Sequence, residues 1–567
     1  MLDTSPARPA EASAKGAPAR AVFEILRAWG IDHVFTCPGS TEAAFLDVSA
    51  QYPDVRLVLV THESIAIAAA DGYTRVTGRP AVAYLHTNVG LANCVAHLDC
   101  AQLARSPVVI LNGMKSTEIQ NRGGFTTASH QRDYVRQHVV YDRIALRPEQ
   151  VAEDLIRALK AATAEPGGPV YLGLPQDIME SSAHVLIPDV KRRVVRARRR
   201  PDPESVAEAA RRLAAAQRLI IVAGSEVARN DARAELETLA SRLDAVVLLE
   251  ERRTMQWNGV APNGTRFAGF YSAQHPAVSE ADVIFFAGAP STMEYDAAKV
   301  PNVPPNATIV HLCCDPMEIA KVDPADVALV GNVKLALADV SAALPYGEAA
   351  GLERAAFRAR SVATYREIAN ARRARARAQF GRVPIDIQAL AQALHGLLED
   401  DCVIVGQPTT AGSDMLNITF SESNRTYHKS SGGSLGWGMG AAVGVALGLR
   451  RRVYSLVGDG VFQFGIQALW SAAGLKLPIT FILNDNSSYA AVKGALKRYR
   501  DGDESGPWPG TDTSGPDYAA IARGFGAHGV RVDRLSDLRA ALDDARRIEG
   551  PSVICVRTDP AVAGHSA

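Results

Sequence analysis

Short apolar runs alternate with longer amphipathic segments along most of the chain. The runs Val55–Val60, Ala81–Leu85 and Val283–Ala287 are bounded by turn residues, and segments with apolar positions at helical spacing separate such runs. Strands that alternate with helices are joined by crossover connections, so they lie parallel in a sheet that helices cover on both faces. The pattern therefore predicts an α/β fold made of doubly wound parallel sheets.

The alternation falls into three blocks separated by polar connectors. Each block is long enough for a core of its own, at roughly 150 residues per domain. The basic tract Lys191–Arg200 could bind nucleic acid, but in a chain of balanced charge we interpret it as a solvated connector. The predicted organisation is a disordered tail (1–18), a first domain (19–189), a central domain (201–344), a helical linker (345–382) and a last domain (383–562).

Composition excludes several classes of protein. The 567 residues carry 61 basic and 61 acidic side chains, which gives no overall footprint for nucleic acid or an anionic membrane surface. No stretch reaches the ~20 consecutive apolar residues of a membrane span, and the tail lacks the apolar core of a signal peptide. Cys313 and Cys314 are too close in sequence for a zinc pair, so we expect reduced, buried thiols and a cytoplasmic protein.

Two neighbouring apolar runs of the last block end in side chains that carry oxygen. These are Asp459 and Asn486, and the segment Phe462–Leu475 between them is predicted as a single crossover helix. Parallel neighbours would bring both side chains to the carboxyl edge of the sheet, where open α/β sheets bind ligands. Such oxygens suit Mg²⁺, which takes further ligands from phosphate and water, and a carbonyl near Ser488 could supply a third protein ligand. The spacing predicts a magnesium–diphosphate site.

A single carboxylate stands at a similar junction in the first block. Glu63 follows the run Val55–Val60 and opens a segment of helical spacing, 64–77. The helix dipole stabilises an ionised carboxylate at a helix amino end, so by this segment alone a purely electrostatic role is the simpler interpretation. A catalytic role becomes the favoured interpretation only together with the magnesium–diphosphate pattern.

Several further segments carry a resemblance that covers nearly the whole chain after residue 18. With Glu63 and the Asp459 to Asn486 pattern, they resemble the thiamine diphosphate (ThDP) enzymes of the acetohydroxyacid synthase and pyruvate decarboxylase superfamily, and most closely the benzoylformate decarboxylases. The segments are Val34–Glu42, Tyr84–Asn93, Gly288–Pro290, Cys314–Glu318 and Gly432–Gly436. The resemblance implies a pyrimidine-binding first domain, a central domain and a diphosphate-binding last domain.

The resemblance also implies roles for individual residues. Glu63 would activate ThDP, whose thiazolium ring is an electron sink, while Ser40 would orient the substrate carboxylate and His86 would move a proton. Without the resemblance, His86 would be interpreted as a structural residue at a strand end. The implied metal ligands are Asp459, Asn486 and Ser488. The implied ThDP-binding residues are Glu63, Asn93, Thr409, Thr410, Gly433, Leu435, Gly458, Gly460 and Ser488.

Departures from the family pattern bear on the substrate. The benzoylformate decarboxylases have a second active-site histidine, but the matching segment 291–296 contains none; Glu294 is a candidate substitute or an exposed loop carboxylate. The segment after the metal site is basic, and we interpret it as a solvated helix face; at the pocket mouth it would favour an acidic or phosphorylated substrate. Its cations are Lys493, Lys497, Arg498 and Arg500. Candidates for the pocket lining are loop 121–131 and Phe125, Met293, Trp437, Phe464 and Tyr489.

These features favour a ThDP- and Mg²⁺-dependent carbon–carbon lyase, a decarboxylase of small 2-oxo acids that also joins the product to an aldehyde as a carboligase. The alternatives are an acetolactate-synthase-like transferase and a 2-hydroxyacyl-CoA lyase. A non-catalytic regulatory protein of the ThDP fold is an alternative of a different class. It would be expected to have lost Glu63 or the metal pair, and both are present.

Two further expectations concern the cofactor of the central domain and the assembly. FAD is not expected, because the glycine turns at Gly224 and Gly288 lack the Gly-x-Gly-x-x-Gly fingerprint. Glu63 and the metal ligands lie in different blocks, which members of the family bring together across a subunit interface. A homodimer is therefore the expected minimum and a homotetramer the expected assembly, without nucleic-acid or membrane partners.

Overall fold

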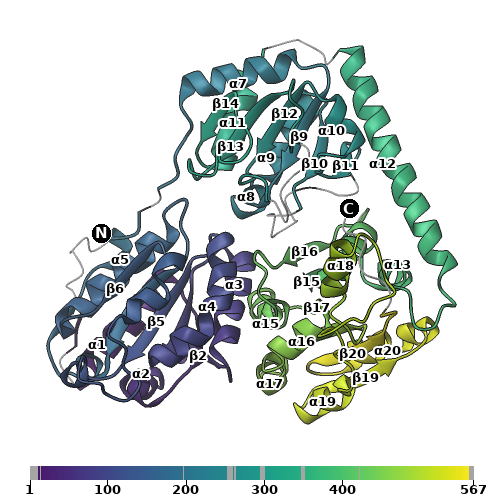
Figure 1. Ribbon diagram of the computed structural model, residues 1–567. Helices are drawn as coiled ribbons and strands as arrows, with labels where there is room; N and C mark the ends of the chain where they lie inside the picture. Colours follow the sequence, from purple (N-terminus) through teal and green to yellow (C-terminus); the bar gives the residue numbers. More distant parts are fainter. Residues whose placement is uncertain are drawn as a thin grey trace.

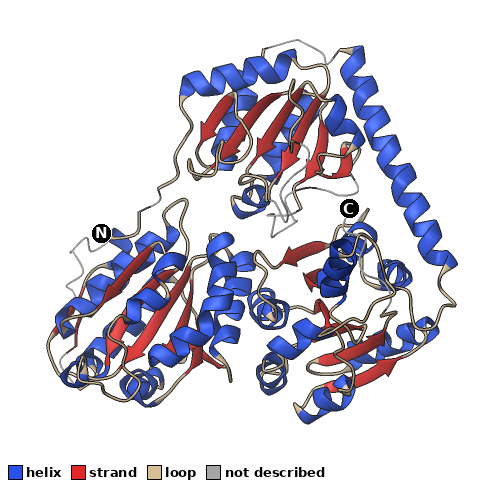
Figure 2. Ribbon diagram, viewed as in Figure 1, coloured by secondary structure: helices blue, strands red, loops and turns tan. Residues whose placement is uncertain are grey.

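The computed structural model describes residues 10–12, 15–195, 197–251, 260, 264–293, 301–345, 351–420 and 422–560. Figure 1 shows three α/β lobes, with the long helix α12 (Leu352–Ala378) running along one side of the molecule from the central lobe toward the last. Each lobe contains a six-stranded sheet whose neighbouring strands are all parallel, and helices flank the sheets (Figure 2). The predicted fold of three doubly wound parallel-sheet domains is confirmed.

The first sheet has the strand order β3-β2-β4-β5-β7-β6. Its strands are β2 (His33–Cys37), β3 (Arg56–Leu59), β4 (Ala81–His86), β5 (Val108–Met114), β6 (Tyr141–Ile144) and β7 (Val170–Pro175). Its helices are α1 (Ala17–Trp29), α2 (Ala43–Ser49), α3 (Glu63–Thr77), α4 (Thr87–Leu103), α5 (Val151–Thr163) and α6 (Gln176–Met179).

A small antiparallel pair completes this lobe. It joins β1 (Ala10–Ala12) to β8 (Val185–Ile187), and α1 begins soon afterwards at Ala17. The prediction of a disordered tail over 1–18 is therefore wrong for these residues. The physical reason is that β8 offers unpaired backbone groups, which residues 10–12 satisfy by pairing.

The central sheet has the order β11-β10-β9-β12-β13-β14. Its strands are β9 (Leu219–Ala223), β10 (Val246–Leu249), β11 (Phe267–Phe270), β12 (Val283–Ala287), β13 (Thr308–Cys313) and β14 (Val327–Val330). Its helices are α7 (Pro203–Ala215), α8 (Ser225–Arg229), α9 (Arg233–Arg242), α10 (Pro276–Glu280) and α11 (Val333–Ala343). The strand order reverses between β9 and β12, so their carboxyl ends form the switch point at which such sheets bind ligands.

The last sheet has the order β16-β15-β17-β18-β20-β19. Its strands are β15 (Val403–Gln407), β16 (Thr426–Lys429), β17 (Val453–Gly458), β18 (Ile479–Asp485), β19 (His528–Val532) and β20 (Ser552–Arg557). Its helices are α13 (Ile387–Leu397), α14 (Gly412–Asp414), α15 (Trp437–Leu449), α16 (Asp459–Gly465), α17 (Ala468–Gly474), α18 (Ala490–Tyr499), α19 (Tyr518–Gly524) and α20 (Leu538–Arg547).

The crossover between β17 and β18 differs from its prediction. It consists of the two short helices α16 and α17 and not of one helix over 462–475. The break follows Gly465, where an added Cβ would lie 2.6 Å from the carbonyl oxygen of Gly436. A glycine is required by this close approach, and glycine weakens a helix because it leaves the backbone more freedom to lose.

Helices α3 and α15 pack against each other and join the first and last lobes in one hydrophobic core. An added Cβ on Gly444 would lie 1.8 Å from the Ala69 carbonyl oxygen, and one on Gly440 would lie 2.7 Å from the Ala68 Cβ. The distance between two packed helices depends on the side chains at their contact, so these glycines allow the close crossing.

A buried ion pair ties the same two lobes together. Arg75 and Asp71 of α3 pair at 2.7 Å with side chains 4% and 0% exposed, and Trp437 Nε1 donates to Asp71 Oδ2 at 2.8 Å. The guanidinium also lies over the indole ring. The prediction that Trp437 lines a pocket is therefore wrong, because the indole is buried between the lobes, where its N–H finds a carboxylate.

Candidate active site

The carboxyl edge of the first sheet brings Ser40 and His86 together. His86 is the last residue of β4, and Ser40 is the exposed first residue of the short turn that follows β2. The imidazole Nδ1 lies 3.0 Å from Thr41 Oγ1, and an added Cβ on Gly39 would lie 2.4 Å from the same ring atom. The turn that carries Ser40 is thus packed directly against the imidazole.

Glu42 is a residue of this edge whose role the sequence analysis missed. Its side chain is fully buried, and its Oε2 lies 3.0 Å from His86 Nδ1 and accepts the Gly39 amide at 2.6 Å. An added Cβ on Gly113 would meet Glu42 Oε1 at 1.6 Å, so glycine there makes room for the carboxylate. A buried carboxylate that faces a ring nitrogen of a histidine fixes the orientation of the ring.

Lys115, which follows β5, was also missed. Its Nζ donates to Ser40 Oγ at 3.4 Å. An ammonium beside a hydroxyl at a sheet edge can bind a carboxylate, since both groups donate hydrogen bonds and the ammonium adds opposite charge. No local sequence signal pointed to Lys115, because its meeting with Ser40 depends on the order of β2, β4 and β5.

Glu63 opens α3, as predicted from the sequence. His62 caps this helix by accepting the Ser64 amide at 3.2 Å, and Asn93 Nδ2 donates to Glu63 Oε2 at 3.0 Å. Burial, followed by the charge of Glu63, raises the pKa of the nearby Cys37 thiol to about 11. The structure thus brings together Glu63 and Asn93, which both belong to the implied ThDP-binding set.

The carboxyl edge of the last sheet brings the proposed metal ligands together. The strands β17 and β18 are parallel neighbours, Asp459 follows the first and Asn486 follows the second. Asp459 accepts the Gly460 amide at 2.8 Å, and Asn486 Oδ1 accepts the Ser488 amide at 3.1 Å. Burial raises the pKa of Asp459 to about 6, although the Gly460 and Ser488 amides act to lower it. A bound cation would compensate this buried carboxylate.

The remaining residues implied for ThDP surround this edge. Thr409 Oγ1 would lie 3.5 Å from an added Cβ at Gly458, and Leu435 Cδ1 would lie 4.0 Å from one at Gly460. Thr410 is the next residue in the same short turn after β15. Gly433 is exposed, and an added Cβ there would meet nothing within 4 Å, so the space beside it is open.

Three residues with side chains adopt the left-handed backbone conformation at the ends of strands that carry these groups. They are Thr87 after β4 at φ 50°, Thr409 after β15 at φ 46° and Ser487 after β18 at φ 51°. Such a conformation is uncommon, above all for a β-branched residue, and is retained where the surroundings enforce it, which is typical of functional sites. Strain is thus present beside His86, in the Thr409 turn and beside Ser488.

His97 connects the two edges within one chain. Its Nδ1 lies 2.8 Å from the Ser64 carbonyl oxygen and its Nε2 lies 3.0 Å from the Leu435 carbonyl oxygen. Burial lowers the pKa of His97. The amino end of α3, which carries Glu63, and the segment before α15, which carries Leu435, are therefore held side by side.

Comparison with known proteins identifies the family of the chain. Residues 18–134 match the N-terminal TPP binding domain of thiamine pyrophosphate enzymes, residues 206–340 match their central domain and residues 405–556 match their C-terminal TPP binding domain. The chain belongs to the thiamine pyrophosphate enzymes. Thiamine pyrophosphate is another name for ThDP, so the resemblance seen in the sequence is confirmed.

Relatives within the family include decarboxylases and synthases. The benzoylformate decarboxylase of Pseudomonas aeruginosa is 30% identical over 553 residues, which cover 95% of this chain and 98% of the relative. The acetolactate synthase large subunit of Corynebacterium glutamicum is 24% identical and covers 94% and 86% of the two chains. The solved benzoylformate decarboxylase of Polynucleobacter necessarius superposes with a TM-score of 0.84 at 26% identity, covering 97% of this chain and 99% of its own. The 4-hydroxybenzoylformate decarboxylase of Rhodococcus jostii RHA1 gives a TM-score of 0.81 at 25% identity, over 96% and 99%.

The residues of the site fit ThDP. Thr87 Oγ1 and Asn88 Oδ1 are buried and have no hydrogen-bond partner among the described residues, and both lie in the first turn of α4, directly after His86. Buried polar atoms are normally paired, so such orphans are consistent with a ligand that supplies partners. The open space beside Gly433 and the buried carboxylate of Asp459 are also consistent with a bound ThDP and its metal ion.

Several other predicted features lie elsewhere. Glu294 falls outside the described residues. Phe125 is 83% exposed and Phe464 is 57% exposed, whereas Tyr489 lies 3.3 Å from the position of a Cβ on Gly460 and so lies near the metal ligands. In the basic segment, Lys497 pairs with Glu504 and Arg500 donates to the Pro507 carbonyl at 2.7 Å. None of the helices in the described part of the chain combines the length and apolar character that a bilayer crossing requires.

Proposed function

We propose that the chain is a ThDP- and Mg²⁺-dependent carbon–carbon lyase that decarboxylates a 2-oxo acid and has carboligase activity. The observation that carries the proposal is the set of groups at the edge of the first sheet, where Lys115 donates to Ser40 and Glu42 faces His86. Hydrogen-bond donors for a carboxylate thus lie beside an oriented imidazole. The homology with benzoylformate decarboxylases, one of them 30% identical, supports the same reaction class.

When bound, ThDP supplies a carbon nucleophile and an electron sink for the electrons released as the carboxylate leaves. The side chains of this chain would do the rest. Glu63, held by Asn93, would hydrogen-bond the pyrimidine ring and assist the proton transfer that activates the cofactor. Ser40 and Lys115 would orient the substrate carboxylate, and the imidazole of His86 would deliver the proton that replaces carbon dioxide.

The last sheet would hold the diphosphate and the metal. Asp459, Asn486 and the backbone carbonyl near Ser488 would bind Mg²⁺, which prefers oxygen ligands. The turn Thr409–Thr410 and the glycines Gly458 and Gly460 would receive the diphosphate, because hydroxyls and unhindered amides donate to phosphate oxygens. Gly433 and Leu435 would contact the rest of the cofactor.

We also propose that the central domain holds no FAD and that the chain forms an oligomer. An added Cβ on Gly224 would lie 2.3 Å from Ala289 Cα, so the loops after β9 and β12 pack together at the switch point, which supports a domain without FAD. A homodimer is the proposed minimum and a homotetramer the proposed assembly. All seven cysteines are free thiols, six of them buried, which supports a cytoplasmic location.

The test is carbon dioxide release from a panel of 2-oxo acids that includes benzoylformate, pyruvate and branched-chain acids. Release that requires added ThDP and Mg²⁺, and that Glu63→Gln abolishes while the fold is retained, is the expected result. Unchanged release by this variant would contradict the proposed role of Glu63.

Absence of release from every acid, with ThDP demonstrably bound, would reject the decarboxylase proposal. Formation of acetolactate from pyruvate or cleavage of a 2-hydroxyacyl-CoA would then identify one of the alternative reactions. Failure to bind ThDP would reject the whole catalytic proposal. The panel also identifies the substrate class. With the acid that is used, Lys115→Gln should raise KM, because Lys115 is proposed to orient the substrate carboxylate.

A further inference from the structure

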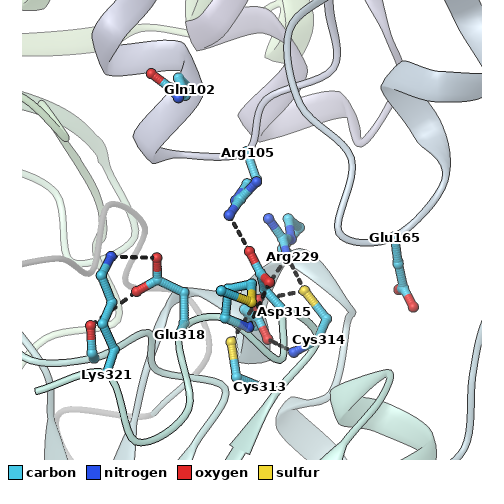
Figure 3. A network of polar contacts seen from close by, with 12 residues as sticks. Gln102, Arg105, Glu165, Arg229, Cys313, Cys314, Asp315, Glu318 and Lys321 are labelled. Atoms are coloured by element: carbon cyan, nitrogen blue, oxygen red, sulfur yellow. Dashed lines mark hydrogen bonds and ion pairs between the residues drawn. The ribbon is translucent and has the colours of Figure 1, made fainter. Parts of the chain in front are cut away.

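A cluster of two thiols, a carboxylate and a guanidinium lies at the carboxyl edge of the central sheet (Figure 3). Cys313 ends β13, Cys314 follows it, and Glu226 and Arg229 belong to α8. In the part of the chain that the structure describes, Glu226, Cys313 and Cys314 are the one group of three metal-ligating side chains whose ligand atoms all lie within 4.8 Å of one another. All three are buried, and the proposed active site uses none of them.

The geometry of the cluster suits a single ion. Glu226 Oε1 lies 2.7 Å from Cys314 Sγ and 3.6 Å from Cys313 Sγ, and Glu226 Oε2 accepts the Cys314 amide at 3.0 Å. Two sulfur ligands of a tetrahedral zinc ion, at ~2.3 Å from the metal, lie about 3.8 Å apart. All the ligand atoms lie within 4.8 Å of one another, and the short contact between Glu226 and Cys314 would have to open to admit the ion. The carboxylate that completes the set comes from α8, which is why the adjacent cysteines alone did not suggest a zinc site.

The charges of the cluster balance with and without an ion. Arg229 Nη2 lies 2.9 Å from Glu226 Oε1 and 3.0 Å from Cys314 Sγ. With both thiols protonated, one carboxylate faces one guanidinium and the net charge is zero. A divalent cation that displaces both thiol protons leaves two thiolates, one carboxylate, one guanidinium and the ion, and these charges again cancel. Net charge is costly in a buried site. The positive charge of Arg229 therefore stabilises the ion-bound form, which would otherwise carry one excess negative charge.

We propose that Cys313, Cys314 and Glu226 bind a zinc-class divalent cation, with Arg229 as the neutralising neighbour. Thiolate ligands favour zinc over magnesium, so this site differs in selectivity from the oxygen ligands around Asp459. Three protein ligands leave the fourth position of a tetrahedral ion for water. Both thiol protons pass to solvent on binding, and no electron is transferred.

The site lies at a contact between two domains. Asp315, the residue after Cys314, forms an ion pair with Arg105 of the first domain, and Figure 3 shows this pair beside the cluster. The side chain of Arg229 is 28% exposed, so it forms the solvent side of the cluster. A bound ion would fix Cys314 and thereby stiffen the turn that carries Asp315.

Cobalt provides a spectroscopic probe for the test. The full-length protein, with its thiols reduced and its magnesium site saturated with ThDP and Mg²⁺, is titrated with Co²⁺. We expect thiolate-to-cobalt charge-transfer absorption that saturates at a single equivalent, releases both thiol protons and disappears when Zn²⁺ is added. The double variant Cys313→Ser, Cys314→Ser should lose the band, and Glu226→Gln should weaken binding by about tenfold or more. Cys402→Ser, which removes a buried cysteine of the last domain, should keep the band.

Several outcomes would overturn the proposal. These are the absence of the band in the unaltered protein, its persistence in the double variant and its loss in Cys402→Ser. A second measurement uses the unaltered protein, so that it does not depend on whether the variants fold. Zn²⁺ should protect the peptide with Cys313 and Cys314 from alkylation during partial unfolding, as followed by mass spectrometry. Equal alkylation with and without Zn²⁺ would reject the site.

Discussion

At the residue scale, the contact between Glu42 and His86 decides what the imidazole can do. The carboxylate is fully buried and is held by the Gly39 amide, so it cannot turn away from the ring. A hydrogen bond from a ring nitrogen to a fixed carboxylate sets the orientation of a histidine. The imidazole that we propose as the proton carrier is therefore kept in place by a residue that need not touch the substrate.

We expect Glu42→Gln to lower turnover while the fold is retained. The amide keeps the size of the side chain but removes the charged acceptor that His86 Nδ1 faces, so the imidazole should be held less firmly in the orientation that the site requires. The loss should stay within the ~10²–10⁴-fold that a general acid–base group contributes. The matched control is Glu149→Gln, which alters an exposed carboxylate. Unchanged turnover in Glu42→Gln, or an equal loss in Glu149→Gln, would contradict the orienting role of Glu42.

The burial of Asp459 predicts a pH dependence of metal binding. Its pKa of about 6 lies above its ordinary value of 3.8. The ionised carboxylate therefore destabilises the metal-free folded protein above pH 6, and this destabilisation decreases as the pH falls through 6. Mg²⁺ binds the ionised form and must compete with a proton at lower pH. The rise in unfolding temperature on addition of Mg²⁺ and ThDP should shrink through this range, as measured by thermal unfolding. A rise that is the same above and below pH 6 would contradict the role of Asp459 as ligand, and Asp459→Asn should abolish the dependence.

At the scale of elements, three strands of the six-stranded sheets in the first two domains were not predicted from the apolar runs of the sequence. Each of them lies at the edge of its sheet. β6, β11 and β14 are each the outermost strand of their sheet. β6 contains Asp142 and Arg143, which are partly exposed or exposed, and so lacks a continuous apolar run. Interior strands are buried on both faces and are apolar throughout, which makes them visible in the sequence.

The packing of α3 on α15 also yields a prediction. Gly444→Ala should destabilise the protein by about 1–3 kcal/mol or more, because the new methyl group would lie 1.8 Å from the Ala69 carbonyl oxygen and the helices would have to separate. Chemical denaturation measures the change. The control is Gly396→Ala in α13, where an added Cβ meets nothing within 4 Å and the higher helix propensity of alanine should stabilise. Equal effects of the two substitutions would contradict the close crossing.

At the scale of the whole molecule, the residues that we propose as catalytic and metal-binding are divided between the first and last domains. Within one chain, His97 holds the amino end of α3 beside Leu435, and the pair Asp71–Arg75 closes the same interface. These contacts keep the two sheet edges in a fixed relation. In the proposed homodimer, the first domain of each subunit also contacts the last domain of the partner subunit.

Mixing two inactive variants tests that assembly. If Glu63 of one subunit serves the metal site of the other, a hybrid of Glu63→Gln and Asp459→Asn subunits has one intact site and one doubly altered site. Such a dimer, purified through two different tags, should recover about half of the wild-type activity, as expected for a symmetric interface with two equivalent sites. Either variant alone should be inactive. A purified hybrid without activity would show that each site forms within one chain.

The sequence by itself determined the α/β class, the positions of most interior strands and the placement of Glu63, Asp459 and Asn486 at strand ends. These properties depend on local periodicity and on the burial of apolar runs, which neighbouring residues encode. Glu63 lies at the start of α3, and Asp459 and Asn486 follow adjacent parallel strands, as the spacing predicted.

The tertiary structure alone decided which distant side chains meet. It brings Glu42 to His86, Lys115 to Ser40 and Glu226 to the two cysteines, and it buries Trp437 between two lobes. The physical reason is that strand order and helix packing choose the neighbours of a loop, and one sequence position carries no local trace of a partner far away in the chain. The placement of polar side chains at the strand ends was therefore predictable, and the groups that contact them from other strands were not.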